Sequence, residues 1–207
     1  MADIEKNLKE IFSEISAGND RGEKIALLGA TKFVPTEKIN EAVAAGLEYI
    51  GENHAQEFRD KFAFYPPCEK HFIGTLQKNK LKYVVGKADV IDSVSNAEIA
   101  EAINEKAATL GIVQSVMLEI NAGDEKTKTG SSIDTAKALY KSIINLNHLK
   151  LIGIMAMLPA GKPTAHCHRQ HNIVMHAASS PVSVAPRVAD MGLEIRHFLH
   201  QYGSVFQ

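Results

Sequence analysis

A short run of residues, Ala26-Leu27-Leu28-Gly29-Ala30-Thr31-Lys32, opens a series of strand and helix units in this 207-residue chain. Its apolar residues, followed by the turn signal Pro35, are typical of a strand buried in a parallel sheet. Lys32 should then lie at the carboxyl edge of that sheet, where α/β proteins bind their ligands. A half-buried amine there loses solvation of its charged form, becomes nucleophilic and can form a Schiff base with an aldehyde or ketone. The alternative is a solvated lysine that ends a strand.

Further strands and helices follow at regular intervals. Apolar residues at helical spacing predict a helix over 3–17 before the first strand. Short apolar runs predict strands at 25–31, 49–51, 71–74, 90–94, 113–120 and 151–157. Helices are predicted between them at 36–46, 53–62, 78–85, 96–110 and 133–145, with Thr36 as an N-cap and Gly46 as a C-terminal stop. Parallel strands need crossover helices, so this alternation predicts an α/β fold with a parallel sheet. Six strands without a Gly-x-Gly-x-x-Gly motif favour a (β/α)8 TIM-type barrel over a dinucleotide-binding fold.

The composition is that of an ordinary globular domain, with 45% hydrophobic and 23% charged residues. A formal net charge of −1 gives no electrostatic support for binding nucleic acid or an anionic membrane. No apolar run reaches the roughly 18 residues that a membrane span requires. The mixed charges of residues 1–6 are not typical of a signal peptide, and two cysteines are too few for a disulfide framework. We therefore expect a cytoplasmic protein with free thiols.

Six short motifs recur in an order that resembles one protein family. They are Gly29-Ala30-Thr31-Lys32; Gly51-Glu52-Asn53 with Gln56-Glu57; His71-Phe72-Ile73-Gly74-Thr75-Leu76-Gln77-Lys78-Asn79-Lys80; Asp92-Ser93-Val94; the polar loop at 121–130; and Gly153-Ile154-Met155-Ala156-Met157. On these motifs, residues 1 to about 162 closely resemble the pyridoxal-phosphate homeostasis proteins, also called the YggS or PROSC family. Each motif alone is a weak signal, whereas their ordered recurrence is highly specific.

The resemblance implies a modified (β/α)8 barrel of the kind found in the N-terminal domain of alanine racemase. Pyridoxal 5'-phosphate (PLP) would bind at the mouth formed by the carboxyl ends of its strands, held as a Schiff base on Lys32. The family proteins lack the second, β-rich domain of the racemase and are regarded as buffering PLP without turning over a substrate. We accordingly expect a PLP homeostasis protein with no catalytic residue.

Three further residues are candidate cofactor contacts: Asn53, Gln77 and Met155. Asn53 follows the strand at 49–51, where its amide can reach the cofactor or cap the next helix. Gln77 lies just past a strand end, and its amide can contact the cofactor ring or brace the loop. Met155 contributes to the pocket floor if it faces the barrel lumen, and ordinary core packing is the alternative.

Two other groups of residues are assigned no site. Lys126 and Lys128 lie in the polar loop, where solvated charges are favoured over contacts to an anion or a partner. His166, Cys167, His168 and His171 are metal-ligand residue types, but no second ligand group lies at a known spacing from them. We predict no metal site.

The sequence changes character after Lys162. All 18 lysines lie at or before this position, whereas the last 45 residues hold six of the nine histidines and two acids. The family pattern continues with a Ser-Met-Gly-Met-Ser and an Arg-Ile-Gly-Thr motif that bind the phosphate, and neither is present here. We divide the chain into a PLP-binding barrel domain at 1–162, with six β/α units, and an anomalous tail at 163–207. The last two β/α units are thus altered or missing, and a frameshifted or otherwise altered end is our interpretation.

The altered end predicts two physical consequences. Cofactor retention should weaken, because each charge-assisted hydrogen bond lost from the phosphate costs roughly 1.5–3 kcal/mol. Six strands cannot close an eight-stranded barrel, so the first and sixth strands should present open, apolar edges. The tail is expected to be partly disordered, with a weak strand at 182–188 and a short helix at 193–202.

The leading functional interpretation is a PLP homeostasis protein that holds PLP on Lys32 without substrate turnover. One alternative is a PLP-dependent amino-acid racemase-like enzyme, which needs an acid or base on each face of the cofactor. A Schiff-base aldolase and a chain that has lost cofactor binding through its altered end are the others. The expected partners are PLP and PLP-dependent apoenzymes, and we expect a monomer.

Overall fold

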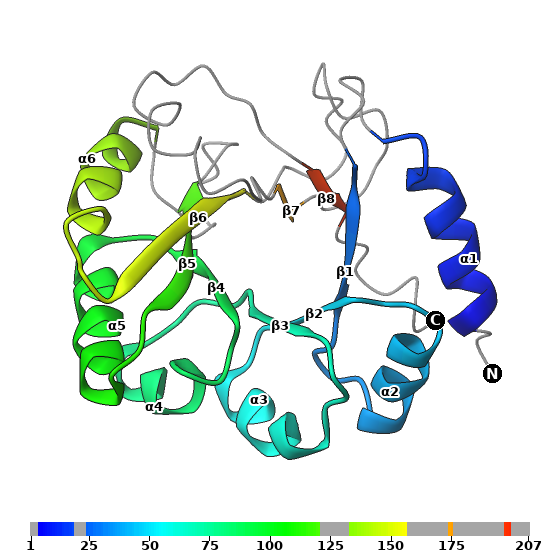
Figure 1. The fold of residues 1–207 in the computed structure, drawn as a ribbon. Helices are drawn as coiled ribbons and strands as arrows, with labels where there is room; N and C mark the ends of the chain where they lie inside the picture. The colour runs from blue at the N-terminus through cyan, green and yellow to red at the C-terminus, as the bar shows by residue number, and fades with distance from the viewer. Residues whose placement is uncertain (1–3, 19–23, 121–132, 157–173, 176–196, 200–207) are drawn as a thin grey trace.

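In the computed structural model of this chain, six parallel strands curve around a common axis and the helices pack outside them (Figure 1). The structure describes residues 4–18, 24–120, 133–156, 174–175 and 197–199. In chain order its elements are α1 (Ile4–Ile15), β1 (Ala26–Ala30), α2 (Thr36–Ala44), β2 (Tyr49–Glu52), α3 (Ala55–Lys61), η1 (Phe62–Phe64), β3 (Glu69–Phe72), η2 (Lys78–Lys80), α4 (Leu81–Val84), β4 (Val90–Val94), α5 (Ala97–Leu110), β5 (Gln114–Ile120), α6 (Ile133–Ile143), β6 (Leu149–Ala156), β7 (Val174–Met175) and β8 (His197–Leu199).

The sheet has the strand order β6-β5-β4-β3-β2-β1-β8-β7. Strands β1 to β6 follow one another in space as they do in sequence, and every adjacent pair among them is parallel. A helical connection joins each strand of this series to the next, as parallel pairing requires. The predicted α/β barrel of six successive units is confirmed.

The two remaining strands come from the tail and differ from regular barrel units. β8 is parallel to β1, pairing Phe198 with Ala26 and Leu199 with Leu27, and β7 is antiparallel to β8. The predicted helix over 193–202 was therefore wrong at His197–Leu199, and the predicted open edge of β1 was wrong at its first two residues. The reason is that backbone groups along a strand edge need partners, and β8 supplies them. β7 and β8 are both short, as expected for altered last units. β6 lies at the opposite end of the strand order from β7. The strand predicted at 182–188 lies outside the described residues.

Local signals mark the ends of α2 and the start of α5. The side chain of Asn96 accepts a hydrogen bond from the backbone N–H of Ile99 at 2.9 Å, which caps α5. Gly46, with φ of 104°, follows α2 as predicted, because this left-handed conformation favours glycine. The N-cap prediction was wrong by one residue: α2 begins at Thr36, and Pro35 occupies the N-cap position. Proline supplies a fixed φ there instead of a capping side chain.

The core has an outer layer, between sheet and helices, and an inner layer in the barrel lumen. Successive strand residues point to opposite faces, so each strand contributes to both layers. The outer layer consists of two clusters, one with Ile4, Leu8, Leu27, Ile39 and Ile50, the other with Phe58, Phe72, Ile91, Ile103 and Leu118. The inner layer includes Leu28, Ala30 and Ile73 on β1 and the loop after β3, and Val90, Met117 and Met155 on β4 to β6. The lumen is therefore packed with side chains over its apolar part.

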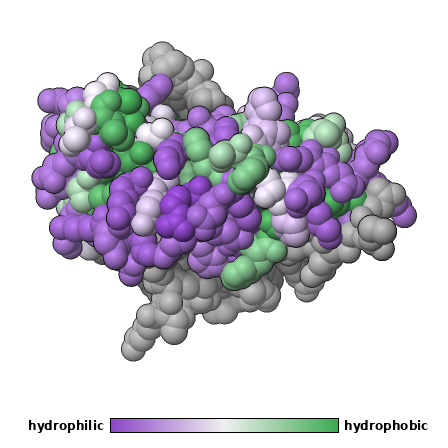
Figure 2. All heavy atoms as spheres, turned by 90° about the horizontal axis from the view of Figure 1, so that it is seen from below, coloured by the Kyte–Doolittle hydropathy of each residue, from purple (hydrophilic) through white to green (hydrophobic). Residues whose placement is uncertain are grey.

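The side of the molecule at the bottom of Figure 1, around α2, α3 and α4, carries mainly hydrophilic residues with scattered apolar ones (Figure 2). Among the described residues, no helix combines the length and the apolar character that crossing a membrane requires.

Candidate functional site

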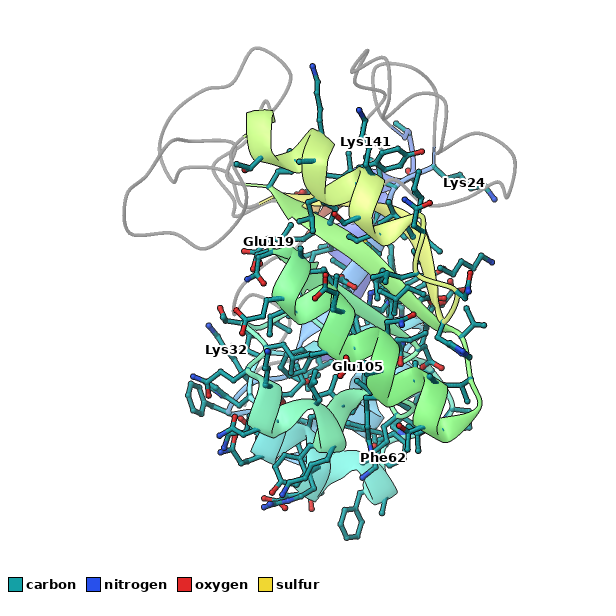
Figure 3. All side chains as sticks on the ribbon, turned by 90° about the vertical axis from the view of Figure 1, so that its left-hand side faces the viewer. Lys24, Lys32, Phe62, Glu105, Glu119 and Lys141 are labelled. Atoms are coloured by element: carbon teal, nitrogen blue, oxygen red, sulfur yellow. The ribbon has the colours of Figure 1, made fainter. Side chains whose placement is uncertain are left out.

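Lys32 and Asn53 lie side by side at the carboxyl edge of the sheet. Lys32 follows β1 after Thr31, and Asn53 comes directly after β2. The two strands pair Ala30 with Gly51, and the Thr31 N–H donates to the Gly51 carbonyl at 2.8 Å, so both chains leave the sheet at the same level. In Figure 3, Lys24, which precedes β1, lies on the opposite side of the molecule from Lys32. The predicted placement of Lys32 at the carboxyl edge of the sheet is confirmed.

The chain turns sharply at Lys32. The Lys32 side chain is half-buried, whereas the next residue, Phe33, is 79% exposed and has a φ of 60°. This left-handed conformation is uncommon for a residue other than glycine, asparagine or aspartate. The centroid of the Phe33 ring lies 5.0 Å from the centroid of the His54 ring. The Val34 N–H donates to the Thr31 carbonyl at 3.1 Å and closes the turn, while Phe33 inside it keeps the disfavoured conformation.

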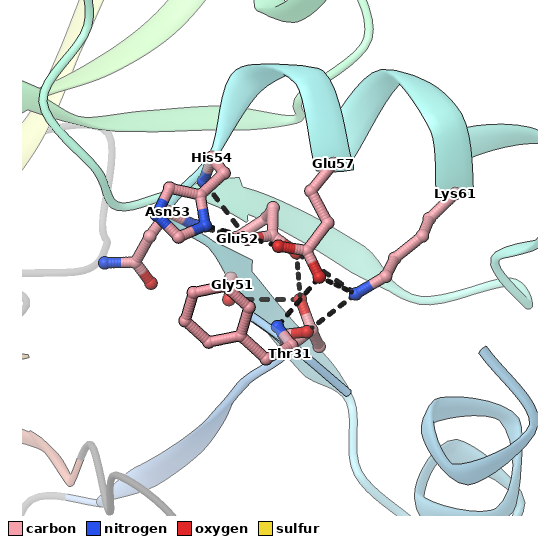
Figure 4. Close-up of polar contacts among 8 residues, drawn as sticks. Thr31, Gly51, Glu52, Asn53, His54, Glu57 and Lys61 are labelled. Carbon is pink, nitrogen blue, oxygen red and sulfur yellow. Dashed lines mark hydrogen bonds and ion pairs between the residues drawn. The ribbon is translucent and has the colours of Figure 1, made fainter. Parts of the chain in front are cut away.

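Two side chains from α3 hold this turn (Figure 4). The Lys61 ammonium donates to the carbonyl of Thr31 at 2.9 Å, on one side of Lys32. On the other side, the N–H of Phe33 donates to Glu57 Oε1 at 2.8 Å. Lys61 and Glu57, four residues apart on the helix, form an ion pair at 2.5 Å. The turn that carries Lys32 is therefore attached to α3, the helix that follows β2.

Glu52 anchors the end of β2 beneath this turn. Its carboxylate is 1% exposed and accepts the backbone N–H groups of Asn53 at 2.8 Å and His54 at 3.1 Å. Lys61 Nζ lies 3.5 Å from its other oxygen, and the Thr31 hydroxyl is 3.3 Å from the same atom. Burial raises the pKa of Glu52, while the two N–H donors oppose that shift.

The pKa of Glu57 moves the other way. Burial alone would raise it, but hydrogen bonds from Lys61, the Phe33 amide and His54 lower it. The atoms of Glu52, His54 and Glu57 that could bind a metal ion, two carboxylate oxygens and one imidazole nitrogen, lie within 4.8 Å of one another. In this structure the ammonium of Lys61 provides the cation among these carboxylates.

The other predicted contacts occupy different positions. Asn53 is partly buried, and the alternative role of N-cap for the next helix was wrong, because His54 stands at the N-cap of α3. Gln77 is exposed and precedes η2. Met155 is 2% exposed and packs in the lumen with Val90 and Met117. The structure thus places Asn53 beside Lys32 and Met155 among lumen side chains, and their contact with a cofactor stays a prediction.

Gly74 lets the loop after β3 approach the end of β2. A Cβ at Gly74 would lie 2.0 Å from the carbonyl oxygen of Asn53. The Ile73 N–H donates to the Glu52 carbonyl at 2.9 Å, which brings the two backbones together at this point. The glycine of the His71-Phe72-Ile73-Gly74 motif is therefore required by backbone contact.

A buried ionic pair lies in the strands below this edge. His71 on β3 and Asp92 on β4 are both fully buried, and His71 Nδ1 lies 2.9 Å from Asp92 Oδ1. His71 Nε2 lies 3.3 Å from a carboxylate oxygen of Glu69. Burial alone would lower the pKa of His71, but Asp92 and Glu69 raise it to about 9. Burial raises the pKa of Asp92, and the imidazolium opposes that shift.

Glu57, His71 and Asp92 are motif residues to which the sequence assigns no role, and Lys61 is not among the motif residues. Glu57 and Lys61 carry the spacing of a helical ion pair, which is the signal that could have linked them. Nothing in the sequence indicates that they reach the Lys32 turn. Lys126, Lys128, His166, Cys167, His168 and His171 lie outside the described residues.

Comparison with known proteins places the chain among relatives of this architecture. The model of the alanine racemase N-terminal domain family matches residues 31–191. The pyridoxal phosphate homeostasis protein of Escherichia coli (strain K12) is 32% identical over 206 residues, covering 95% of this chain and 83% of that protein. This chain belongs to the pyridoxal phosphate homeostasis protein family.

The family member from Aquifex aeolicus (strain VF5) is 42% identical over 142 residues, or 67% of this chain. The match spans 62% of that relative, which is less than two thirds of its length. The structure of PipY from Synechococcus elongatus PCC7942 with PLP bound is 26% identical with a TM-score of 0.65, covering 77% of this chain and 73% of PipY. The family match continues past residue 162, and a domain boundary at that point stays a prediction.

Proposed function

We propose that this pyridoxal phosphate homeostasis family member binds PLP, holds it as a Schiff base on Lys32 and serves intracellular PLP homeostasis without turning over a substrate. The observation that carries the proposal is the position of Lys32, half-buried at the carboxyl edge of β1 in a barrel that resembles PLP-bound PipY. The names of the relatives in the family support the same cofactor.

The residues around Lys32 fit this cofactor chemically. The amine of Lys32 would hold the aldehyde carbon, and the amide of Asn53, at the same level of the sheet, would contact polar groups of the ring. PLP supplies an aldehyde for covalent capture and a ring that withdraws electrons. Gln77 and Met155 are proposed as further contacts, Gln77 from the exposed loop and Met155 from the lumen.

The decisive experiment is a PLP titration followed by absorbance and by peptide mass spectrometry after borohydride reduction. We expect an absorbance band at about 420 nm, where Schiff bases of PLP generally absorb, and one reduced adduct on Lys32. Lys32→Ala should abolish both, whereas the matched control Lys24→Ala, an exposed lysine before β1, should keep both. A band that persists in Lys32→Ala would refute the assignment of Lys32. The absence of a band in the unaltered chain would support the alternative that the altered end has abolished cofactor binding.

We also propose that the protein is a cytoplasmic monomer that passes PLP to PLP-dependent apoenzymes. Light scattering on the purified chain tests the monomer, and transfer to an apoenzyme tests the recipient, since activity should appear without added free PLP. An assay of amino-acid turnover distinguishes this function from a racemase-like one. Steady racemisation that requires Lys32 would contradict a role without turnover.

A further inference from the structure

We propose that Glu57 and Lys61 are positioning residues that fix the direction in which Lys32 presents its amine. The proposal rests on the assignment of Lys32 as the PLP-binding lysine. It concerns two side chains of α3 to which the proposed function assigns no role.

The two contacts hold the peptide groups on both sides of Lys32. The Thr31 carbonyl, which precedes Lys32, accepts a hydrogen bond from Lys61 at 2.9 Å. The Phe33 N–H, which follows Lys32, donates to Glu57 at 2.8 Å. The two backbone torsions of a residue are rotations between these two peptide planes. With both planes held, the bond from Cα to Cβ of Lys32 has a fixed direction.

The holding groups are partly shielded from water. The side chain of Lys61 is 13% exposed and that of Glu57 is 21% exposed. A single oxygen, Glu57 Oε1, accepts from both the Phe33 amide and Lys61, so one carboxylate joins the two contacts. Charge-assisted hydrogen bonds of this kind are stronger than neutral ones. They form a defined connection from α3 to the turn.

The turn has a backbone hydrogen bond of its own, from the Val34 N–H to the Thr31 carbonyl at 3.1 Å, and the α3 contacts add to it at a strained residue. Phe33 has a φ of 60°, a conformation that bulky residues disfavour, and its ring is largely exposed instead of being packed in the core. Apart from the contact of its ring with that of His54, side-chain packing at Phe33 therefore contributes little to holding the turn. The acceptor of its amide, Glu57, takes over this role, and Lys61 holds the other peptide group.

The test compares Glu57→Ala and Lys61→Met with a matched pair on α1. Glu5 and Lys9 form an ion pair of the same spacing on the exposed face of α1, so Glu5→Ala and Lys9→Met are the controls. Three quantities are measured for each folded variant: the hydrogen-exchange rate of the Phe33 amide, the rate constant for PLP attachment to Lys32, and the thermal midpoint. Lys61→Arg, which keeps the charge, serves as the conservative variant.

We expect the Phe33 amide to exchange about tenfold faster in both α3 variants and PLP attachment to slow by about tenfold, the factor that roughly 1.4 kcal/mol represents. The controls should change neither quantity, and Lys61→Arg should restore part of the attachment rate. A merely structural role would lower the thermal midpoint while leaving the attachment rate of the folded protein unchanged, and that result would overturn the proposal. Unchanged exchange at Phe33 would overturn it as well.

The same experiment separates this proposal from the assignment of Lys32. If PLP fails to attach to the unaltered chain, the proposed function fails, and the positioning role has no reaction to serve. If PLP attaches at equal rates in the unaltered chain and both α3 variants, the proposed function stands and the positioning role fails.

Discussion

Replacing Gly74 by alanine tests how strictly the structure determines the end of β2. The added Cβ would lie 2.0 Å from the Asn53 carbonyl oxygen and 2.6 Å from its carbonyl carbon, both of which are backbone atoms. Reaching ordinary contact at 3.4 Å requires a displacement of about 1.4 Å, the difference between the two distances. Side-chain rotation cannot supply this displacement, so the backbone after β2 or β3 must move. Without a clash, a Gly→Ala change at an ordinary φ would stabilise the protein by roughly 0.4–1 kcal/mol.

We therefore expect Gly74→Ala to lower the free energy of unfolding by about 3 kcal/mol, the upper part of the usual range for overpacking. Urea denaturation with a fixed slope measures this quantity. The control is Gly111→Ala, where φ is 67° and nothing lies within 4 Å of the added Cβ, so that backbone conformation alone should cost roughly 1–2 kcal/mol. PLP affinity should also fall in Gly74→Ala. The clash displaces the backbone of Asn53, which leaves the sheet at the same level as Lys32. A Gly74→Ala protein as stable as the unaltered chain would refute the reasoning.

Three further changes have separate physical causes. Because the pKa of His71 is raised from 6.5 to about 9, its protonated form stabilises the fold fully below pH 6.5 and loses this effect as the pH rises through about 9. The stability difference between the unaltered chain and His71→Gln should therefore shrink from pH 6 to pH 10 in urea unfolding. Phe58→Ala removes a 1% exposed ring that contacts Phe72, and thermal unfolding should show a loss of about 3–5 kcal/mol. Asn96→Ala removes the cap of α5 and should cost about 1 kcal/mol, while Asn96→Ser should keep most of the stability.

Each of these changes has an outcome that would contradict its cause. A stability difference for His71→Gln that grows with pH would show that the imidazolium does not stabilise the fold. A loss below about 1 kcal/mol in Phe58→Ala would mean that the outer layer refills the space left by the ring. Equal stabilities of Asn96→Ala and Asn96→Ser would exclude a role for the side-chain cap.

The sequence predicts the position of Lys32 but not the contacts that hold the residues beside it. The position of Lys32 followed from the apolar run before it, because a buried strand with a lysine at its end leaves that lysine at the edge of the sheet. The links from Glu57 and Lys61 to Thr31 and Phe33 could not follow, because the distance between these residues depends on how α3 packs on the sheet. The same holds for His71 and Asp92, which meet only across two strands.

The sequence by itself determined the order and type of the first six strand and helix units, since periodicity and turn residues are local properties of the chain. It also determined which lysine ends the first strand. The tertiary structure alone decided the partners of that lysine's neighbours, the close approach at Gly74 and the pairing of β8 with β1. These features join residues far apart in the sequence, and their energies depend on distances and burial that exist only after the sheet has formed.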